Sequence, residues 1–199
     1  MPEYLLPYDA LLAEATESSI PINHYLRREI PYLWKDAYLE MTPRPTNIVI
    51  LTHGTFDYVY DDYATLEAMG VVVADGATEA RLVGAIGVSQ PNPKRRDDSR
   101  LRGWVGPTGA TFGSNWDKGH FIAHSIGGAV DGLEANVFLQ LRTVNRGVYR
   151  DMERYCAANP GVLCFSRPLY CDPSARPSQV EFGVVKPNNA LWVNVFENR

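Results

Sequence analysis

Short runs of apolar, often β-branched residues, each closed by glycine, proline or a polar cluster, recur along this chain. Runs of this length between turn residues predict strands rather than helices. They cover residues 47–54, 71–76, 80–90, 119–128, 162–170, 179–186 and 191–196. Because few helical segments separate these strands, we expect them to form a mainly antiparallel sheet.

Helical patterns occupy the front of the chain and one segment between the strands. They cover residues 8–20, residues 22–41 with Pro31 inside, and about 144–158, which ends at Asn159-Pro160-Gly161. Helices combined with an antiparallel sheet indicate an α+β fold. The segment MTPRPT, residues 41–46, contains two prolines and predicts a boundary between an N-terminal helical segment, 1–45, and a second unit, 46–199. The front segment either packs on the sheet or serves delivery, docking or regulation.

The hydropathy pattern argues against a membrane protein. No run of about 18 apolar residues occurs, and the acidic N-terminus lacks the basic start and apolar block of a secretory signal. We therefore expect no membrane partner and either a cytoplasmic protein or export by a non-Sec route.

The three cysteines, Cys156, Cys164 and Cys171, fit neither a zinc site nor a disulfide framework. We therefore expect packed thiols, although a disulfide between Cys156 and Cys164 stays open.

The net charge of −4 is unevenly distributed. Residues 1–93 carry 5 basic and 13 acidic side chains, whereas residues 94–199 carry 14 and 10. Binding of a polyanion depends on the potential at a groove rather than on total charge. The acidic total therefore does not exclude a nucleic-acid substrate for the basic half.

Two fragments suggest an α/β-hydrolase with Ser125 as nucleophile. Thr52-His53-Gly54 resembles its oxyanion loop, and His124-Ser125-Ile126-Gly127-Gly128 resembles its nucleophile elbow. In that fold, however, the catalytic histidine follows the serine along the chain. No histidine follows Ser125, so this interpretation is the weaker one.

A second constellation has the residue types that phosphodiester hydrolysis needs. It begins at Asp117-Lys118-Gly119-His120 and continues, before and into the predicted helix, with Asn136, Gln140, Asn145 and Glu153. A histidine can act as a base near neutral pH. Carboxamide and carboxylate oxygens suit a hard divalent cation. Together they predict metal-assisted attack of water on a phosphate.

This block resembles the ββα-metal (His-Me finger) family of non-specific DNA/RNA endonucleases, whose signature is D-R-G-H, then N, Q, N-[RQ]-G and a Glu. The resemblance covers about 117–185 and implies an active site built from a β-hairpin and a helix. It implies that His120 is the general base, that Asn145 ligates the metal, and that Glu153 holds metal-bound water. Asn136 and Gln140 would support the motif, and Asp117 would adjoin the catalytic histidine.

The implied cofactor is Mg²⁺, with Mn²⁺ or another divalent ion as a substitute. Lys118 departs from the family pattern, which has arginine there; lysine keeps the charge but loses the bidentate fork. The resemblance also implies an upstream arginine for the phosphate. Four residues compete for that role: Arg95, Arg96, Arg100 and Arg102.

Four arginines spaced four apart would line one face of a helix: Arg142, Arg146, Arg150 and Arg154. Such a row can bind a phosphate backbone without reading bases. The alternative is a solvated face partnered by Asp151 and Glu153. Function is favoured for Arg146 and Arg150, which lie nearest to Asn145. Three aromatic residues could stack on bases, although a place in the core is favoured for each: Trp104, Trp116 and Tyr149.

The sequence therefore predicts a metal-dependent endonuclease that cuts DNA, and RNA as a second substrate, with little sequence preference. Its expected setting is a bacterial toxin with an inhibitory or immunity protein, or a defence nuclease, because an unrestrained nuclease endangers its own cell. The alternative is a nucleic-acid- or protein-binding module with a degenerate nuclease site.

Overall fold

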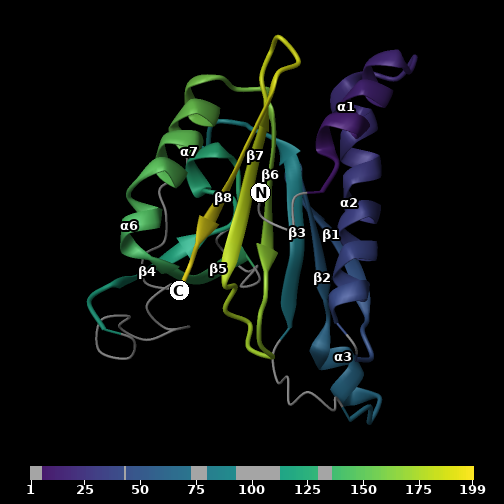
Figure 1. Cartoon of the computed structure of the whole chain (residues 1–199), viewed down its shortest axis with the longest axis vertical. Helices are drawn as coiled ribbons and strands as arrows, with labels where there is room; N and C mark the ends of the chain where they lie inside the picture. Colours follow the sequence, from purple (N-terminus) through teal and green to yellow (C-terminus); the bar gives the residue numbers. More distant parts are fainter. Residues whose placement is uncertain (1–5, 43, 73–79, 93–112, 130–135) are drawn as a thin grey trace.

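A six-stranded antiparallel sheet forms the centre of the protein (Figure 1). The computed structural model describes residues 6–42, 44–72, 80–92, 113–129 and 136–199. The strand order is β1-β2-β3-β6-β7-β8. The strands are β1 (Ile48–His53), β2 (Phe56–Asp61), β3 (Arg81–Val88), β6 (Leu163–Leu169), β7 (Gln179–Val185) and β8 (Leu191–Glu197). The α+β fold class predicted from the sequence is confirmed.

Two helices cover one face of this sheet: α1 (Tyr8–Glu17) and α2 (Ile22–Met41). Helix α2 buries a stripe at four-residue intervals, Leu26, Ile30, Trp34 and Tyr38, against the sheet. The sequence predicted a helical pattern interrupted at Pro31, yet α2 continues through this residue. Burial of each large side chain contributes about 1.5–3 kcal/mol. The stripe therefore outweighs the roughly 3 kcal/mol that proline costs inside a helix.

The opposite face of the sheet carries a second, smaller unit. Strands β4 (Trp116–His120) and β5 (Val137–Leu141) pair antiparallel, with Asp117 opposite Gln140 and Gly119 opposite Phe138. Helices α6 (Arg142–Asn145) and α7 (Val148–Ala158) follow directly. Tyr149 and Met152 of α7 are fully buried in the core that this unit shares with the sheet. The strand–strand–helix order expected for the active-site motif is present.

Several local expectations differ from the structure. Strand β2 and the short helix α3 (Tyr63–Ala68) were not predicted, although β2 pairs on both sides within the sheet. Val71 and Val72 lie outside any strand, and the rest of that predicted strand, 73–76, lies outside the described residues. The predicted helix over 144–158 is two helices, because Gly147 separates α6 from α7.

The cysteines settle one further expectation. Cys156 and Cys164 are buried and Cys171 is exposed, and all three are free thiols. The bridge within 156–164 that the sequence left open is therefore absent. Within the described ranges, no helix is both long and apolar enough to cross a membrane.

Candidate active site

A cavity of about 340 Å³ opens where β4 meets α6 and α7. Its described lining consists of Asp117 and Lys118 from β4, Asn145 and Arg146 from α6 and its C-terminal end, and Arg150 and Glu153 from α7. All six were among the residues singled out from the sequence. The fold therefore brings together side chains that are up to 36 positions apart, because α6 starts where β5 ends and returns the chain to β4.

The carboxylate of Asp117 is the centre of this arrangement. It accepts hydrogen bonds from Arg146 Nε at 2.9 Å and Nη2 at 3.1 Å, a bidentate contact. Arg142 Nε donates to it at 3.2 Å, and so does Asn145 Nδ2 at 3.2 Å. One acidic side chain on β4 thus holds three residues of α6 and its C-terminal end in place.

These contacts determine the charge of Asp117 and the orientation of Asn145. Partial burial acts to raise the pKa of the Asp117 carboxyl, but hydrogen bonds from Arg146, Asn145 and Arg142 outweigh it and lower the pKa. Asp117 therefore stays ionised and paired with arginines. Because the Asn145 nitrogen donates to Asp117, its Oδ1 is the atom left to accept a donor or a cation.

Asn136 is fully buried just before β5, and its side chain holds the segment that follows β4 in place. Its Oδ1 accepts the Ile122 N–H at 2.9 Å, and its Nδ2 donates to the carbonyls of Ile122 at 2.9 Å and Ala129 at 2.6 Å. Through these three bonds, the amide of Asn136 satisfies main-chain groups of Ile122 and Ala129, which lie after the end of β4. The side chain thereby fixes the path of the residues that follow His120.

Gln140 is also fully buried, and it packs on Gly119 of the neighbouring strand. A Cβ at position 119 would lie 2.1 Å from Gln140 Oε1 and 2.6 Å from its Cβ, so only glycine fits. Within the described part of the chain, neither Oε1 nor Nε2 of Gln140 has a hydrogen-bond partner. Gln140 therefore fills the space beneath the motif rather than lining the cavity.

His120 ends β4 and is 8% exposed. Its main-chain carbonyl accepts the Tyr149 hydroxyl at 3.1 Å, which links β4 to α7. Unlike Lys118 and Glu153, His120 is not among the residues that line the cavity. The structure thus places it two residues along the strand from the cavity wall and mostly covered.

The arginines of the predicted row divide into two groups, because α6 and α7 are separate helices. Arg142 and Arg146 pair with Asp117, whereas Arg150 lines the cavity without sharing that carboxylate. Arg154 pairs with Asp151 at 3.5 Å, and both side chains are largely exposed. The solvated interpretation therefore describes Arg154.

Several sequence candidates fall elsewhere. Arg95, Arg96, Arg100, Arg102 and Trp104 lie outside the described residues. Tyr149 is fully buried, so stacking on a base is excluded for it. The ring of Trp116 lies against the Arg176 guanidinium, 5.3 Å from ring centroid to Cζ.

Ser125 lies in the single-turn 3₁₀ helix η1 (His124–Ile126). A nucleophile elbow requires a turn between a buried strand and a helix, which this segment does not provide. The hydrolase interpretation of Ser125 therefore has no structural support.

Sequence reasoning missed one supporting residue near the other end of the chain. Asn198 is buried and caps the outer edge of β5: its Oδ1 accepts the Leu141 N–H at 2.8 Å, and its Nδ2 donates to the Leu139 carbonyl at 2.8 Å. These partners are 57 and 59 residues away, so no local pattern could have indicated them.

The donor set fits a hard cation held largely through water. Asn145 Oδ1 and the Glu153 carboxylate supply oxygen atoms at one cavity, which is the ligand chemistry that Mg²⁺ prefers. Among the described residues, no cluster of three or more His, Cys, Asp or Glu side chains could enclose a metal. The cavity also carries Lys118, Arg146 and Arg150, so it is suited to a negatively charged substrate.

Comparison with known proteins gives partial similarities to nucleases. No protein-family model matches the chain. Over 86 residues, 41% of this chain, it is 30% identical to "Probable deoxyribonuclease RhsA" of Dickeya dadantii (strain 3937), and the match spans 6% of that protein's length. A solved structure described as "extracellular endonuclease" aligns with a TM-score of 0.36 and 13% identity, covering 77% of this chain and 79% of that chain. The chain is thus similar, over part of its sequence, to a protein named as a probable deoxyribonuclease.

Proposed function

We propose that this protein is a metal-dependent endonuclease that hydrolyses phosphodiester bonds of DNA, and of RNA as a second substrate, with little sequence preference. The observation that carries the proposal is the cavity that unites the predicted motif residues of β4, α6 and α7. The partial similarity to a probable deoxyribonuclease supports it independently.

In this proposal Lys118, Arg146 and Arg150 attract the phosphate backbone. The three cations face two carboxylates at the cavity, and Asp117 is already neutralised by Arg142 and Arg146. A phosphate entering the cavity therefore meets a positive potential. Contacts of this kind bind any sequence, since they touch the backbone and not the base edges.

Hydrolysis needs a water oxygen to form a bond to phosphorus while the bond to the leaving 3′-oxygen breaks. We assign to a His120 ring nitrogen the proton that the attacking water loses, and a second water protonates the leaving oxygen. Asn145 Oδ1 and, through water, Glu153 would hold the divalent cation. A bound Mg²⁺ would neutralise developing charge on the phosphate and acidify bound water.

The decisive test is plasmid cleavage with and without EDTA, using the wild-type protein and a His120→Ala variant. We expect the wild type to nick DNA only with a divalent ion and His120→Ala to lose nearly all cleavage while keeping its circular dichroism spectrum. His53→Ala is the matched control, because His53 is an exposed histidine on β1. Wild-type cleavage by the His120 variant, or cleavage in EDTA, would refute the mechanism.

A second test concerns Asn145. Loss of its amide oxygen should weaken cation binding, so Asn145→Ala should need a higher Mg²⁺ or Mn²⁺ concentration for the same rate. Asn188→Ala, in the exposed turn between β7 and β8, is the control. An unchanged metal dependence would remove Asn145 from the proposed cation site.

One observation favours a second candidate function. His120 is mostly covered and does not line the cavity. A protein with this geometry could bind nucleic acid without cleaving it. DNA retention in a gel-shift assay at low salt, combined with no cleavage in Mg²⁺ or Mn²⁺, would identify such a binding module.

The biological setting is part of the same proposal. A nuclease of this kind must be kept from the DNA of the cell that makes it, so we infer an exported toxin with an inhibitory partner, or a defence nuclease. Co-expression that restores growth to cells producing the wild type would identify such a partner.

A further inference from the structure

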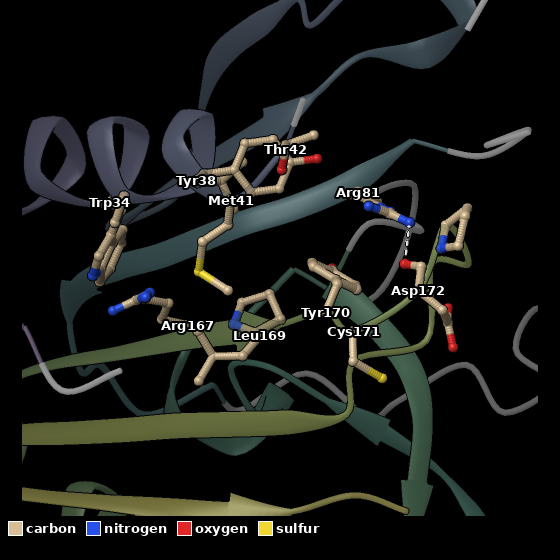
Figure 2. Close-up of a pocket in the computed structure, with 14 residues that line it drawn as sticks. Trp34, Tyr38, Met41, Thr42, Arg81, Arg167, Leu169, Tyr170, Cys171 and Asp172 are labelled. Atoms are coloured by element: carbon tan, nitrogen blue, oxygen red, sulfur yellow. Dashed lines mark hydrogen bonds between the residues drawn. The ribbon is translucent and has the colours of Figure 1, made fainter. Parts of the chain in front are cut away.

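A second cavity lies on the other face of the large sheet, between α2 and strands β3 and β6 (Figure 2). Its volume is about 200 Å³. The walls are mainly aromatic and apolar, from Trp34, Tyr38, Met41, Val83, Leu169 and Tyr170. Two arginines also line it, Arg81 beside Asp172 and Arg167 near Trp34 in the view of Figure 2. The cavity belongs to the core beneath α1 and α2 and shares no lining residue with the candidate active site.

Three arginines are buried in this region, and they differ in their partners. Arg44 Nη2 pairs with Asp61 at 2.9 Å, and Arg167 Nη1 pairs with Glu181 at 3.2 Å. Arg81, at 4% exposure, has no carboxylate oxygen within 4 Å among the described residues. A buried cation without a hydrogen-bonded anion is costly, because burial removes its hydration.

The Arg81 guanidinium has much of its hydrogen-bonding capacity left over. Its Nη2 donates to the main-chain carbonyl of Asp172 at 2.6 Å, the one hydrogen bond that it makes within the described part of the chain. The Nε atom is buried and has no partner there. The guanidinium lies 4.8 Å from the centre of the Tyr170 ring. Ser174 donates two hydrogen bonds to Oδ1 of Asp172, and the charge of Arg81 helps to lower the pKa of this carboxyl without forming an ion pair with it.

We propose that this cavity binds a small molecule with one carboxylate and an apolar body of about the size of a benzene ring. An apolar cavity of about 150 Å³ is known to hold benzene, so about 200 Å³ leaves room for a ring and a carboxylate. The carboxylate would accept from the guanidinium of Arg81 while Trp34, Tyr38 and Leu169 contact the body. A single negative charge matches Arg81, the one of these three buried arginines that forms no ion pair with a carboxylate among the described residues.

Benzoate is the probe, and benzamide is its neutral control. Cys171 is the exposed one of the three thiols and it lines this cavity, so a ligand there should slow its alkylation by N-ethylmaleimide. We expect benzoate to protect Cys171 and to raise the midpoint of thermal unfolding, and benzamide at the same concentration to do neither. Equal effects of the two compounds, or protection by inorganic phosphate but not by benzoate, would overturn the proposal.

Two variants locate the binding. Arg81→Met keeps an unbranched apolar stem and removes the charged guanidinium, and we expect benzoate affinity to fall at least about tenfold. Ala37→Phe leaves Arg81 in place but fills the cavity, and it should abolish protection even if Arg81→Met fails to fold. Arg176→Met, on an exposed arginine, is the control. Unchanged benzoate binding in Ala37→Phe would place the ligand elsewhere and refute the site.

Discussion

Replacement of Asp117 by asparagine tests whether this carboxylate organises the candidate active site. The introduced amide would keep one oxygen that can accept from Arg146 or Asn145, but the charge that pairs with two arginines is lost. The Asp117 side chain is 15% exposed, whereas those of Arg142 and Arg146 are 41% and 59% exposed. Pairs with such exposed partners contribute about 0.2–1 kcal/mol each. We therefore expect Asp117→Asn to lower the free energy of unfolding by about 1 kcal/mol at neutral pH.

The pH dependence of this loss separates the ion pairs from simple packing. The folded state lowers the pKa of Asp117, so its ion pairs stabilise the protein above the unfolded-state pKa, ordinarily about 3.9. That contribution disappears as the pH falls through the folded-state pKa. The stability difference between wild type and variant should therefore be full at pH 7 and shrink towards zero in acid.

The assay is urea denaturation followed by circular dichroism, repeated from pH 7 down to the lowest pH at which the wild type still folds. The control is Glu197→Gln, since the side chains of Glu197 and its partner Arg199 are both about two-thirds exposed and lie 3.7 Å apart. Its effect should stay close to zero at every pH. If the difference in the free energy of unfolding between wild type and Asp117→Asn does not change with pH, the ion pairs of Asp117 are not its cause and the reasoning is refuted.

Three further predictions concern the supports of the site and the thiols. Gly119→Ala should destabilise the protein by about 1–3 kcal/mol in urea, because the new Cβ would overlap the buried Gln140 side chain; an unchanged midpoint would contradict this packing. Asn136→Ala should cost about 3 kcal/mol, since it leaves buried main-chain groups without partners, and a loss below about 1 kcal/mol would show that water replaces the amide. Mass spectrometry after N-ethylmaleimide treatment of the native protein should find one modified thiol, Cys171, and all three after denaturation; modification of the other two in the native state would contradict their burial.

The strands and the site residues differ in how far local sequence could predict them. Strands β3, β6, β7 and β8 are short apolar runs between turns, so the length of each run and its flanking residues were enough to predict a strand. Strand β2 was missed because Asp57 and Asp61 interrupt its apolar pattern. Asp61 is buried because Arg44 pairs with it and Tyr38 and Asn47 donate hydrogen bonds to it. A signal that depends on a partner 17 residues away is absent from the segment itself.

Around the candidate active site, the motif and the row of arginines together identified every described residue that lines the cavity, because these residues come from consecutive elements of one strand–strand–helix unit. Their individual contacts were less predictable. The carboxylate of Asp117 was expected beside His120, but arginines 25 and 29 residues later bind it. Whether an acidic side chain meets a histidine or an arginine depends on how α6 turns back on β4, and spacing alone does not specify that turn.

The sequence by itself determined helices α1 and α2, most strands of the large sheet, the basic character of the second half and the set of chemical groups at the cavity, since each follows from local composition and period. Tertiary structure alone decided that α2 continues through Pro31, that Gln140 is buried against Gly119, and that Arg81 faces a second cavity without a carboxylate partner among the described residues. Each of these outcomes is a balance between desolvation and packing against residues far away in the chain. Such a balance exists only once the sheet has brought those residues together.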